Sequence, residues 1–201
     1  MTPLGLGVES FFSALLRGEN GIRTIERFDT EDFSVRIAGE IRGIHYHADD
    51  HFSTKEQRRM DPFTQFGVVA AREAWKDAGF QGQEPPDPTR SGVILGTGIG
   101  GIQTIMDQHE SLLNNGPRRV SPFFIPNTMA NALPANVAIE FGLQGGCFLT
   151  ASACSSAGHA IGLAMREIRD GRADLMVTGG SEATTTPLCL AGFASLKALS
   201  T

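Results

Sequence analysis

The 201-residue sequence has no long apolar run, no excess of basic residues and few cysteines. No apolar stretch approaches the roughly 20 residues that a membrane-spanning helix needs, and the first residues lack the basic start and apolar centre of a secretory signal. Lysine and arginine number 17 against 22 aspartates and glutamates, a net charge of −5, which provides no basic footprint for nucleic acid. We therefore expect a cytoplasmic protein that binds neither nucleic acid nor a membrane.

Only three cysteines occur, Cys147, Cys154 and Cys189, and their spacing indicates no pairing. An odd count without paired spacing argues against a disulfide framework and favours a reducing compartment. Cys147 lies in an apolar run and Cys189 in PLCLAGF, whereas Cys154 alone stands next to a predicted helix start. Cys154 is therefore the candidate reactive thiol, and we expect the other two to be buried as small apolar side chains.

The pattern of apolar, capping and glycine residues predicts alternating helices and strands. Asp61 and Pro62 mark the start of a helix that Gly79 ends, and Gly142 ends another. The predicted helices cover residues 9–17, 62–78, 102–113, 132–141 and 155–170, and the predicted strands cover 34–41, 91–95, 146–151 and 174–178. The last strand–helix–strand unit has a crossover long enough to join parallel strands, so the expected fold class is α/β.

The stretch GGCFLTASACSSAGHAIG, residues 145–162, places Cys154 between a strand and a helix. A thiol at a helix N-terminus lies beside unpaired backbone N–H groups, which favour the nucleophilic thiolate. A buried small residue in a tight turn is the alternative interpretation of the same pattern. His159 is expected to be structural, because five residues along a helix turn it about 140° away from Cys154. Within this helix, Ala157, Ile161, Ala164 and Ile168 are predicted to form one apolar stripe.

The glycine-rich segment GTGIGG, residues 96–101, matches G-x-G-x-x-G after a predicted strand. A dinucleotide site also needs an acidic residue about 20 positions further on, and RRVSPFFIPN occupies that region instead. A glycine loop that lets chain segments pack closely near an active site is the favoured interpretation.

Three further groups are weaker candidates. The segment HYHADDH, which contains His45, His47, Asp49, Asp50 and His51, has zinc-binding residue types but is predicted to be a solvated loop, so we expect no metal site. Glu182 follows a predicted strand and is expected to cap a loop rather than to orient a substrate. Arg118 and Arg119 are weak evidence for an acidic partner.

Several segments, taken together, resemble the β-ketoacyl-[acyl-carrier-protein] synthases of the synthase I/II type, and most closely synthase II. In chain order they are TPLGLGVESFFSALLRGENGI, KEQRRMDPFTQFGVVAAREA, GTGIGGIQTI, NNGPRRVSPFFIPNTMAN, TASACSSAGHAIG and ADLMVTGGSEATTTPL. These segments span nearly the whole chain, and their order and spacing match those of the family. Such a match is far more specific than any single motif.

The resemblance implies a thiolase-like fold, a layered α-β-α arrangement around a mixed, partly parallel sheet, with residues 1–201 forming the N-terminal domain. It implies that Cys154 is the acylated nucleophile, that the Cys154 N–H is an oxyanion-hole donor, and that Ile105 lines the acyl tunnel. The implied reaction of fatty-acid biosynthesis is decarboxylative Claisen condensation of malonyl-acyl-carrier protein with the Cys154-bound acyl thioester, which yields 3-oxoacyl-acyl-carrier protein. No cofactor is implied beyond the phosphopantetheine that carries the substrates, and the expected partners are acyl carrier protein and a second copy that pairs through strand 146–151.

Family members of this kind also have a C-terminal half with two active-site histidines, a lysine and the second oxyanion donor, and a strand before TPLG. The sequence lacks these parts, so we expect a fragment, a truncated product or one part of a split enzyme whose C-terminal half is a separate chain. We expect the chain alone not to condense acyl groups. A polyketide ketosynthase or a non-catalytic partner resembling a chain-length factor remain alternatives, and a thiolase or a synthase III is less favoured.

Overall fold

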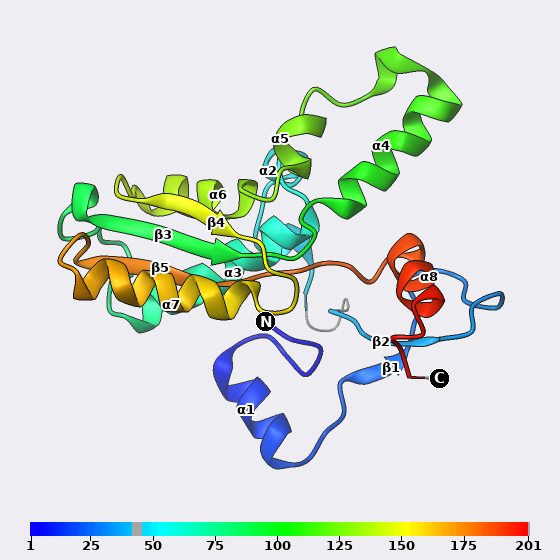
Figure 1. The fold of residues 1–201 in the computed structure, drawn as a ribbon, viewed down its shortest axis with the longest axis horizontal. Helices are drawn as coiled ribbons and strands as arrows, with labels where there is room; N and C mark the ends of the chain where they lie inside the picture. Colours follow the sequence, from blue (N-terminus) through cyan, green and yellow to red (C-terminus); the bar gives the residue numbers. More distant parts are fainter. Residues whose placement is uncertain (42–45, 201) are drawn as a thin grey trace. The chain divides into compact units, whose positions relative to one another are not determined.

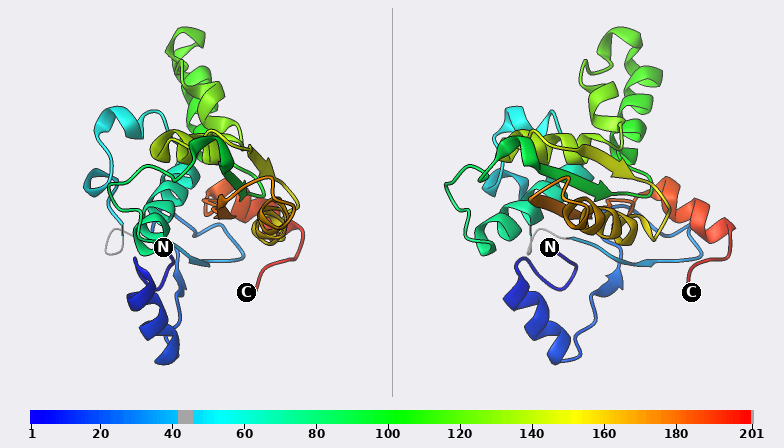
Figure 2. Two further views of the ribbon diagram at one scale, coloured as in Figure 1. Left: turned by 90° about the vertical axis from the view of Figure 1, so that its left-hand side faces the viewer. Right: turned by 60° about the vertical axis from the view of Figure 1, so that its left-hand side comes forward.

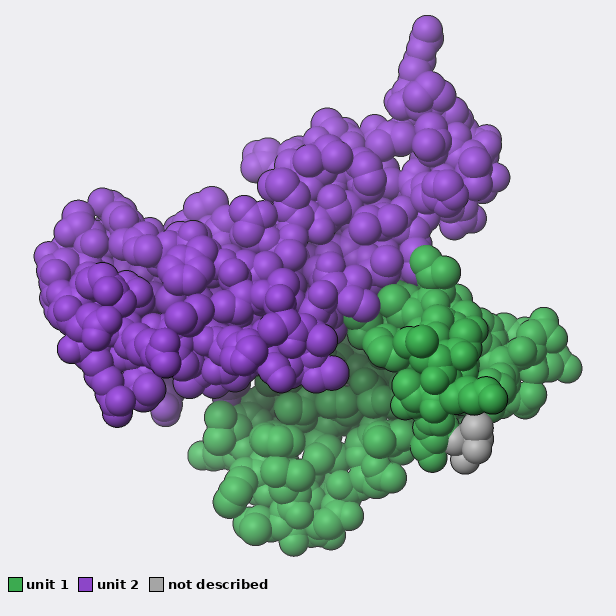
Figure 3. All heavy atoms as spheres, viewed as in Figure 1, with its two compact units in different colours: residues 1–52, 184–201 green, residues 53–183 purple. Residues whose placement is uncertain are grey.

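The computed structural model describes residues 1–41 and 46–200 (Figure 1). These residues form two compact units, residues 1–52 with 184–201, and residues 53–183, which Figure 3 shows in two colours. The first unit contains α1 (Val8–Leu16), β1 (Ile22–Thr24), β2 (Ile37–Gly39), η1 (Ala48–Asp50) and α8 (Pro187–Ser195). The second contains α2 (Thr54–Gln57), α3 (Pro62–Asp77), η2 (Pro88–Arg90), β3 (Ser91–Gly96), α4 (Ile102–Asn115), η3 (Pro117–Arg119), α5 (Phe124–Thr128), α6 (Ala132–Phe141), β4 (Cys147–Thr150), α7 (Ser156–Arg169) and β5 (Leu175–Gly180).

A three-stranded parallel sheet in the order β4-β3-β5 is the centre of the second unit. Every residue of β3 is buried, as expected for a central parallel strand with helices on both faces. Val93 lies opposite Cys147 on one side and Val177 on the other, so all three strands end at the same edge of the sheet. The parallel strands confirm the α/β prediction.

Helices cover both faces of this sheet. Helix α7 packs on β3 and β5, while α6 packs on β3 and β4 and α3 packs behind α6. Figure 2 shows the sheet between α7 on one side and the pair α3 and α6 on the other. Trp75 of α3 stacks on Phe141 of α6 with ring centroids 4.5 Å apart, which joins the two helices of that layer. The layered α-β-α architecture is therefore confirmed.

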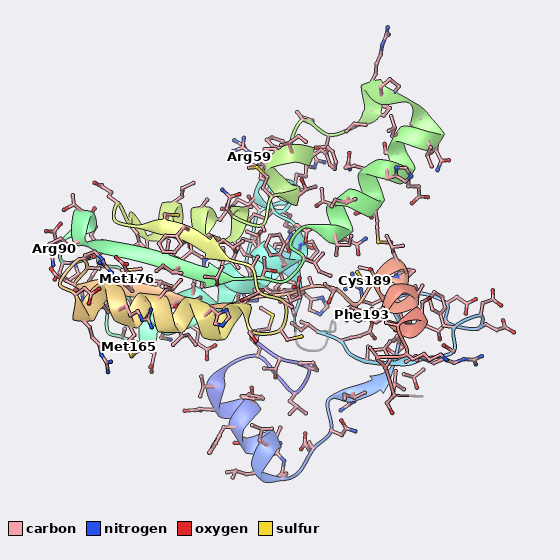
Figure 4. The ribbon with its side chains drawn as sticks, viewed as in Figure 1. Arg59, Arg90, Met165, Met176, Cys189 and Phe193 are labelled. Atoms are coloured by element: carbon pink, nitrogen blue, oxygen red, sulfur yellow. The ribbon has the colours of Figure 1, made fainter. Side chains whose placement is uncertain are left out.

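The buried side of α7 differs from the predicted stripe. Ala160 and Ala164 face the sheet and are buried together with Ile94, whereas Ile161 and Ile168 are 52% and 46% exposed. The reason is the close approach of α7 to the strands, because only small side chains fit between the helix and the sheet. Met165 lies with the two isoleucines on the side of α7 away from the sheet (Figure 4).

The helix ends confirm the local signals in the sequence. The Asp61 side chain caps α3, Pro62 occupies its first turn, and Gly79 follows its end with a positive φ of 85°. Gly142 ends α6 in the left-handed conformation with φ 66°. Residues 116–130, which lie between the predicted helices 102–113 and 132–141, contain the short helices η3 and α5.

The first unit has its own small core. Strands β1 and β2 pair antiparallel with Ile22 opposite Gly39, and β2 lies within the predicted strand. Ile25, Val35 and Leu190 of α8 are buried together, with Phe28 and Phe33 packed against them. Strand β1 was not predicted, because three exposed residues carry no burial pattern.

Of the histidine-rich segment, His45 lies outside the described residues, and Ala48–Asp50 form η1. Across residues 1–41 and 46–200, no three histidine, cysteine or acidic side chains gather as metal ligands would. The described part of the chain also contains no helix with the length and apolarity to cross a membrane.

Candidate active site

Cys154 lies in a tight turn between β4 and α7, at the carboxyl edge of the sheet. Strand β4 ends at Thr150 and α7 begins at Ser156, and the chain reverses over residues 151–155. Ala153, directly before the cysteine, has a φ of 51°, in the left-handed region that residues other than glycine rarely occupy. Because this turn carries the chain past the end of β4, Cys154 lies outside the sheet, and its thiol is exposed. An exposed thiol excludes the buried-residue interpretation.

His159 partners a serine of this turn rather than the cysteine. Its Nδ1 lies 2.5 Å from the Ser152 hydroxyl oxygen, within hydrogen-bonding distance. The hydrogen bonds found among the described residues include none between a histidine and Cys154. His159 thus links the first turns of α7 to the start of the turn, and its structural role stays a prediction.

Two glycines let α7 begin directly on the strands. A Cβ on Gly96 would lie 2.5 Å from the Ser156 carbonyl oxygen, and a Cβ on Gly180 would lie 2.7 Å from the Ala157 Cβ. Because these distances are far shorter than van der Waals contact, a Cβ at either position would clash, and both positions require glycine. The first turn of α7, which follows Cys154, therefore packs directly against the ends of β3 and β5.

The glycine loop after β3 lies beside the cysteine turn. Glu182 Oε2 accepts hydrogen bonds from the Gly98 N–H at 2.7 Å and the Ile99 N–H at 3.1 Å. A Cβ on Gly98 would lie 3.7 Å from the Ala153 carbonyl oxygen, in ordinary van der Waals contact. The expectation that Glu182 caps a loop is confirmed, and Gly98 of this loop lies against the Ala153 backbone, directly before Cys154.

The dinucleotide interpretation of this loop finds no support. The Gly98 and Ile99 amides, which would face a phosphate, are already paired with the Glu182 carboxylate, and an anion would have to displace a like charge. Gly101 serves a packing role, because a Cβ there would lie 2.6 Å from Thr128 Cα. Close approach of chain segments is therefore what these glycines provide.

Ile105 lies in the second turn of α4 and is 41% exposed. Its amide donates to the Gly101 carbonyl at 3.1 Å, so it follows directly from the glycine loop. Ile99, 43% exposed, lies within that loop, next to Gly98 and the cysteine turn. The role of Ile105 in a tunnel stays a prediction, and Ile99 is an apolar side chain that sequence reasoning passed over because it stood inside a glycine motif.

The expectation that Cys147 is buried was wrong. Cys147 is exposed because β4 is an edge strand, and the partial burial of its sulfur raises the pKa of its thiol. Cys189 is half-buried in α8. Arg118 and Arg119 are exposed in η3.

A parallel sheet layered between helices, with a cysteine turn at its carboxyl edge, is the arrangement of the thiolase-like ketosynthases. The ishigamide ketosynthase/chain length factor superposes with a TM-score of 0.86 at 28% identity over 99% of this chain and 49% of that one. A β-ketoacyl synthase from Burkholderia phymatum superposes with a TM-score of 0.84 at 30% identity over 99% of this chain and 48% of that one.

The chain belongs to the β-ketoacyl synthase family, whose N-terminal domain matches residues 1–201. It is 44% identical over its whole length to 3-oxoacyl-[acyl-carrier-protein] synthase 2 of Vibrio cholerae, covering 48% of that protein. It is 43% identical over its whole length to the synthase 2 of Staphylococcus aureus, covering 49% of that protein. The chain therefore spans about half the length of these relatives.

Proposed function

We propose that Cys154 accepts an acyl group from a thioester, as the first step of a 3-oxoacyl-[acyl-carrier-protein] synthase reaction. The observation that carries this proposal is the exposed Cys154 thiol in the turn between β4 and α7. Relatives named for this synthase activity support it. In this step the Cys154 Sγ–acyl bond forms and the donor C–S bond breaks. The leaving thiol takes up the proton that Cys154 gives up.

The proposed second step is a condensation of fatty-acid biosynthesis. A malonyl thioester loses carbon dioxide, and the resulting carbanion attacks the acyl carbon on Cys154. A carbon–carbon bond forms, the Cys154 thiolate leaves, and the product is a 3-oxoacyl thioester. Because no described histidine is hydrogen-bonded to Cys154, we expect the 201-residue chain alone to hold the acyl group without condensing it.

The proposed partners follow from the same chemistry. Acyl carrier protein, named in the relatives, is the proposed donor, and the exposed Arg118 and Arg119 offer it positive charge. A second copy of the chain is proposed to pair along β4, which is an edge strand with an exposed Phe148. A separate C-terminal half is a further proposed partner. Thioester exchange on a free thiol needs no cofactor, and the three free cysteines agree with a reducing cytoplasm.

A polyketide ketosynthase is the second candidate, because one structural neighbour is a ketosynthase/chain length factor. The two activities share acylation of the cysteine and differ in the products of repeated condensation. A non-catalytic partner of the chain-length-factor type would show no acylation of Cys154.

Acylation is tested by incubating the chain with an octanoyl thioester of N-acetylcysteamine and mapping the modified residue by peptide mass spectrometry. We expect the octanoyl group on Cys154, its loss in Cys154→Ala, and its retention in the matched variant Cys147→Ala. Octanoyl groups found on Cys147, or on no cysteine, would contradict the proposal. Adding malonyl thioester to the octanoylated chain tests the second expectation, which is that no 3-oxodecanoyl product forms.

A further inference from the structure

Ser156, the first residue of α7, differs from the serines around it because it is buried, with 3% of its surface exposed. Its hydroxyl oxygen accepts a hydrogen bond from the Ser152 N–H at 2.8 Å. The same hydroxyl donates to the Ala153 carbonyl oxygen at 2.7 Å. One side chain therefore ties the start of α7 to the two residues that precede Cys154.

These bonds determine the direction of the Cys154 amide. The Ala153 carbonyl accepts both the Ser156 hydroxyl and, at 3.1 Å, the Ser156 N–H, so the carbonyl points toward the start of α7. Cis peptide bonds are absent from the described chain, and in a planar trans peptide the C=O and N–H point in opposite directions. The Cys154 N–H therefore points away from Ser156. The hydrogen bonds found among the described residues include none that this N–H donates.

Ser156 is itself held in place by the sheet. The Thr150 hydroxyl donates to the Ser156 carbonyl at 2.8 Å, and the backbone of Gly96 lies directly against the same carbonyl. The Ser156 hydroxyl is therefore fixed in position. Its hydrogen bond to the Ala153 carbonyl holds Ala153 in its strained conformation, with a φ of 51°.

We propose that Ser156 is a positioning residue for acyl transfer, whose hydroxyl orients the Ala153–Cys154 peptide so that the Cys154 N–H meets the thioester oxygen. This inference rests on the proposed function, in which that oxygen gains negative charge as Cys154 Sγ attacks the carbonyl carbon. Ser156 does not touch the substrate and acts through the backbone of Cys154.

Two reactions of Cys154 separate this role from a general loss of structure. Octanoyl transfer from its N-acetylcysteamine thioester builds charge on a carbonyl oxygen, whereas alkylation by iodoacetamide displaces iodide and builds none. We expect Ser156→Ala to slow octanoyl transfer about ten-fold or more and to change alkylation by less than about two-fold. Ser156→Thr, which keeps the hydroxyl, restores the transfer rate. The matched control is Ser155→Ala, because Ser155 is exposed and its side chain makes no capping bond. This variant should leave both rates unchanged.

An unchanged transfer rate in Ser156→Ala, or an equal fall in transfer and alkylation, overturns the inference. If the unsubstituted chain takes up no octanoyl group, the proposed function fails for this chain, and amide hydrogen exchange then decides the role of Ser156. The Ser152 amide, bonded to the Ser156 hydroxyl, should exchange about ten-fold faster in Ser156→Ala while the Ile94 amide of β3 is unchanged. Equal exchange of Ser152 in both proteins overturns the inference by itself.

Discussion

Asp61 Oδ2 accepts a hydrogen bond from the Thr104 N–H at 2.8 Å and so joins two helices whose starts lie far apart in the chain. Its other oxygen accepts the Phe63 N–H at 3.2 Å within α3. Helix α4 begins after Gly101, which has no side chain to satisfy the amides of the first turn. The buried Asp61 carboxylate therefore caps both helices and holds the start of α4, where Ile105 lies, against α3.

Removing this shared cap should destabilise the second unit. Each lost N-cap costs about 1 kcal/mol, so we expect Asp61→Ala to lower the free energy of unfolding by about 2 kcal/mol. Urea unfolding followed by circular dichroism measures the change. Asp77→Ala, at the exposed C-terminal end of α3, is the matched control and should stay within about 0.5 kcal/mol of the parent protein.

Asp61 should also make stability depend on pH. Burial raises its pKa above the ordinary value of 3.8, and the nearby Asp107 adds to the increase, although the bonds from Thr104 and Phe63 act against it. A raised pKa means that the folded protein binds the proton more tightly than the unfolded chain. The stability from this group is therefore complete below the ordinary value and is lost as pH rises through the folded pKa.

The difference in unfolding free energy between the parent protein and Asp61→Asn, measured at intervals from about pH 3 to pH 7, should consequently shrink or reverse as pH rises. The hydrogen bond lost in Asp61→Asn changes this free-energy difference by the same amount at every pH. A difference that grows with pH would show that the carboxylate, not the protonated acid, is favoured in the folded state.

The two exposed cysteines should differ in their reaction with iodoacetamide. Because partial burial raises the pKa of the Cys147 thiol, a smaller fraction of it is thiolate at about pH 7, and we expect Cys154 to be alkylated first. As pH rises, the Cys147 thiolate fraction grows and its rate should rise steeply. Peptide mass mapping at several pH values measures both rates, and faster labelling of Cys147 near pH 7 would be the contrary result.

The predicted role of Ile105 in an acyl tunnel can be tested by side-chain size. Ile105→Trp should slow transfer of a long acyl group to Cys154 by about ten-fold while leaving acetyl transfer within about two-fold, because only a long chain reaches the blocked space. Leu113→Trp, on an exposed position of the same helix, is the matched control. Equal slowing of acetyl and long-chain transfer would show that Ile105 does not line the tunnel.

Pairing along β4 can be tested by placing a charge on the edge strand. Phe148→Lys should weaken self-association about ten-fold or more, because a buried unpaired charge is costly at a subunit contact. Ile139→Lys, at an exposed position of α6, is the control and should leave the association constant within about two-fold. Sedimentation equilibrium measures both. A protein that is monomeric before substitution would exclude this dimer.

Sequence reasoning succeeded where the signal was local. The cap at Asp61, the helix ends at Gly79 and Gly142, and the apolar run of β3 each depend on neighbouring residues, and each is where it was predicted. It failed where the burial of a helix residue depended on how closely the helix packs against the sheet. Ile161 belongs to an apolar helix stripe by periodicity, yet it faces outward because alanines fit the space against the strands.

The sequence by itself determined the main helices and strands of the second unit, which are α3, β3, α4, α6, β4, α7 and β5. It also determined the family of the chain and the place of Cys154 between β4 and α7, because caps, glycines and motif spacing act over a few residues. Only the tertiary structure decided which distant segments are joined by hydrogen bonds near the carboxyl edge of the sheet. Glu182 meets Gly98 across 84 residues and Asp61 meets Thr104 across 43, and no local pattern encodes which distant backbone amide a carboxylate will reach. Those pairings exist because the parallel strands end at one edge and bring remote loops together there.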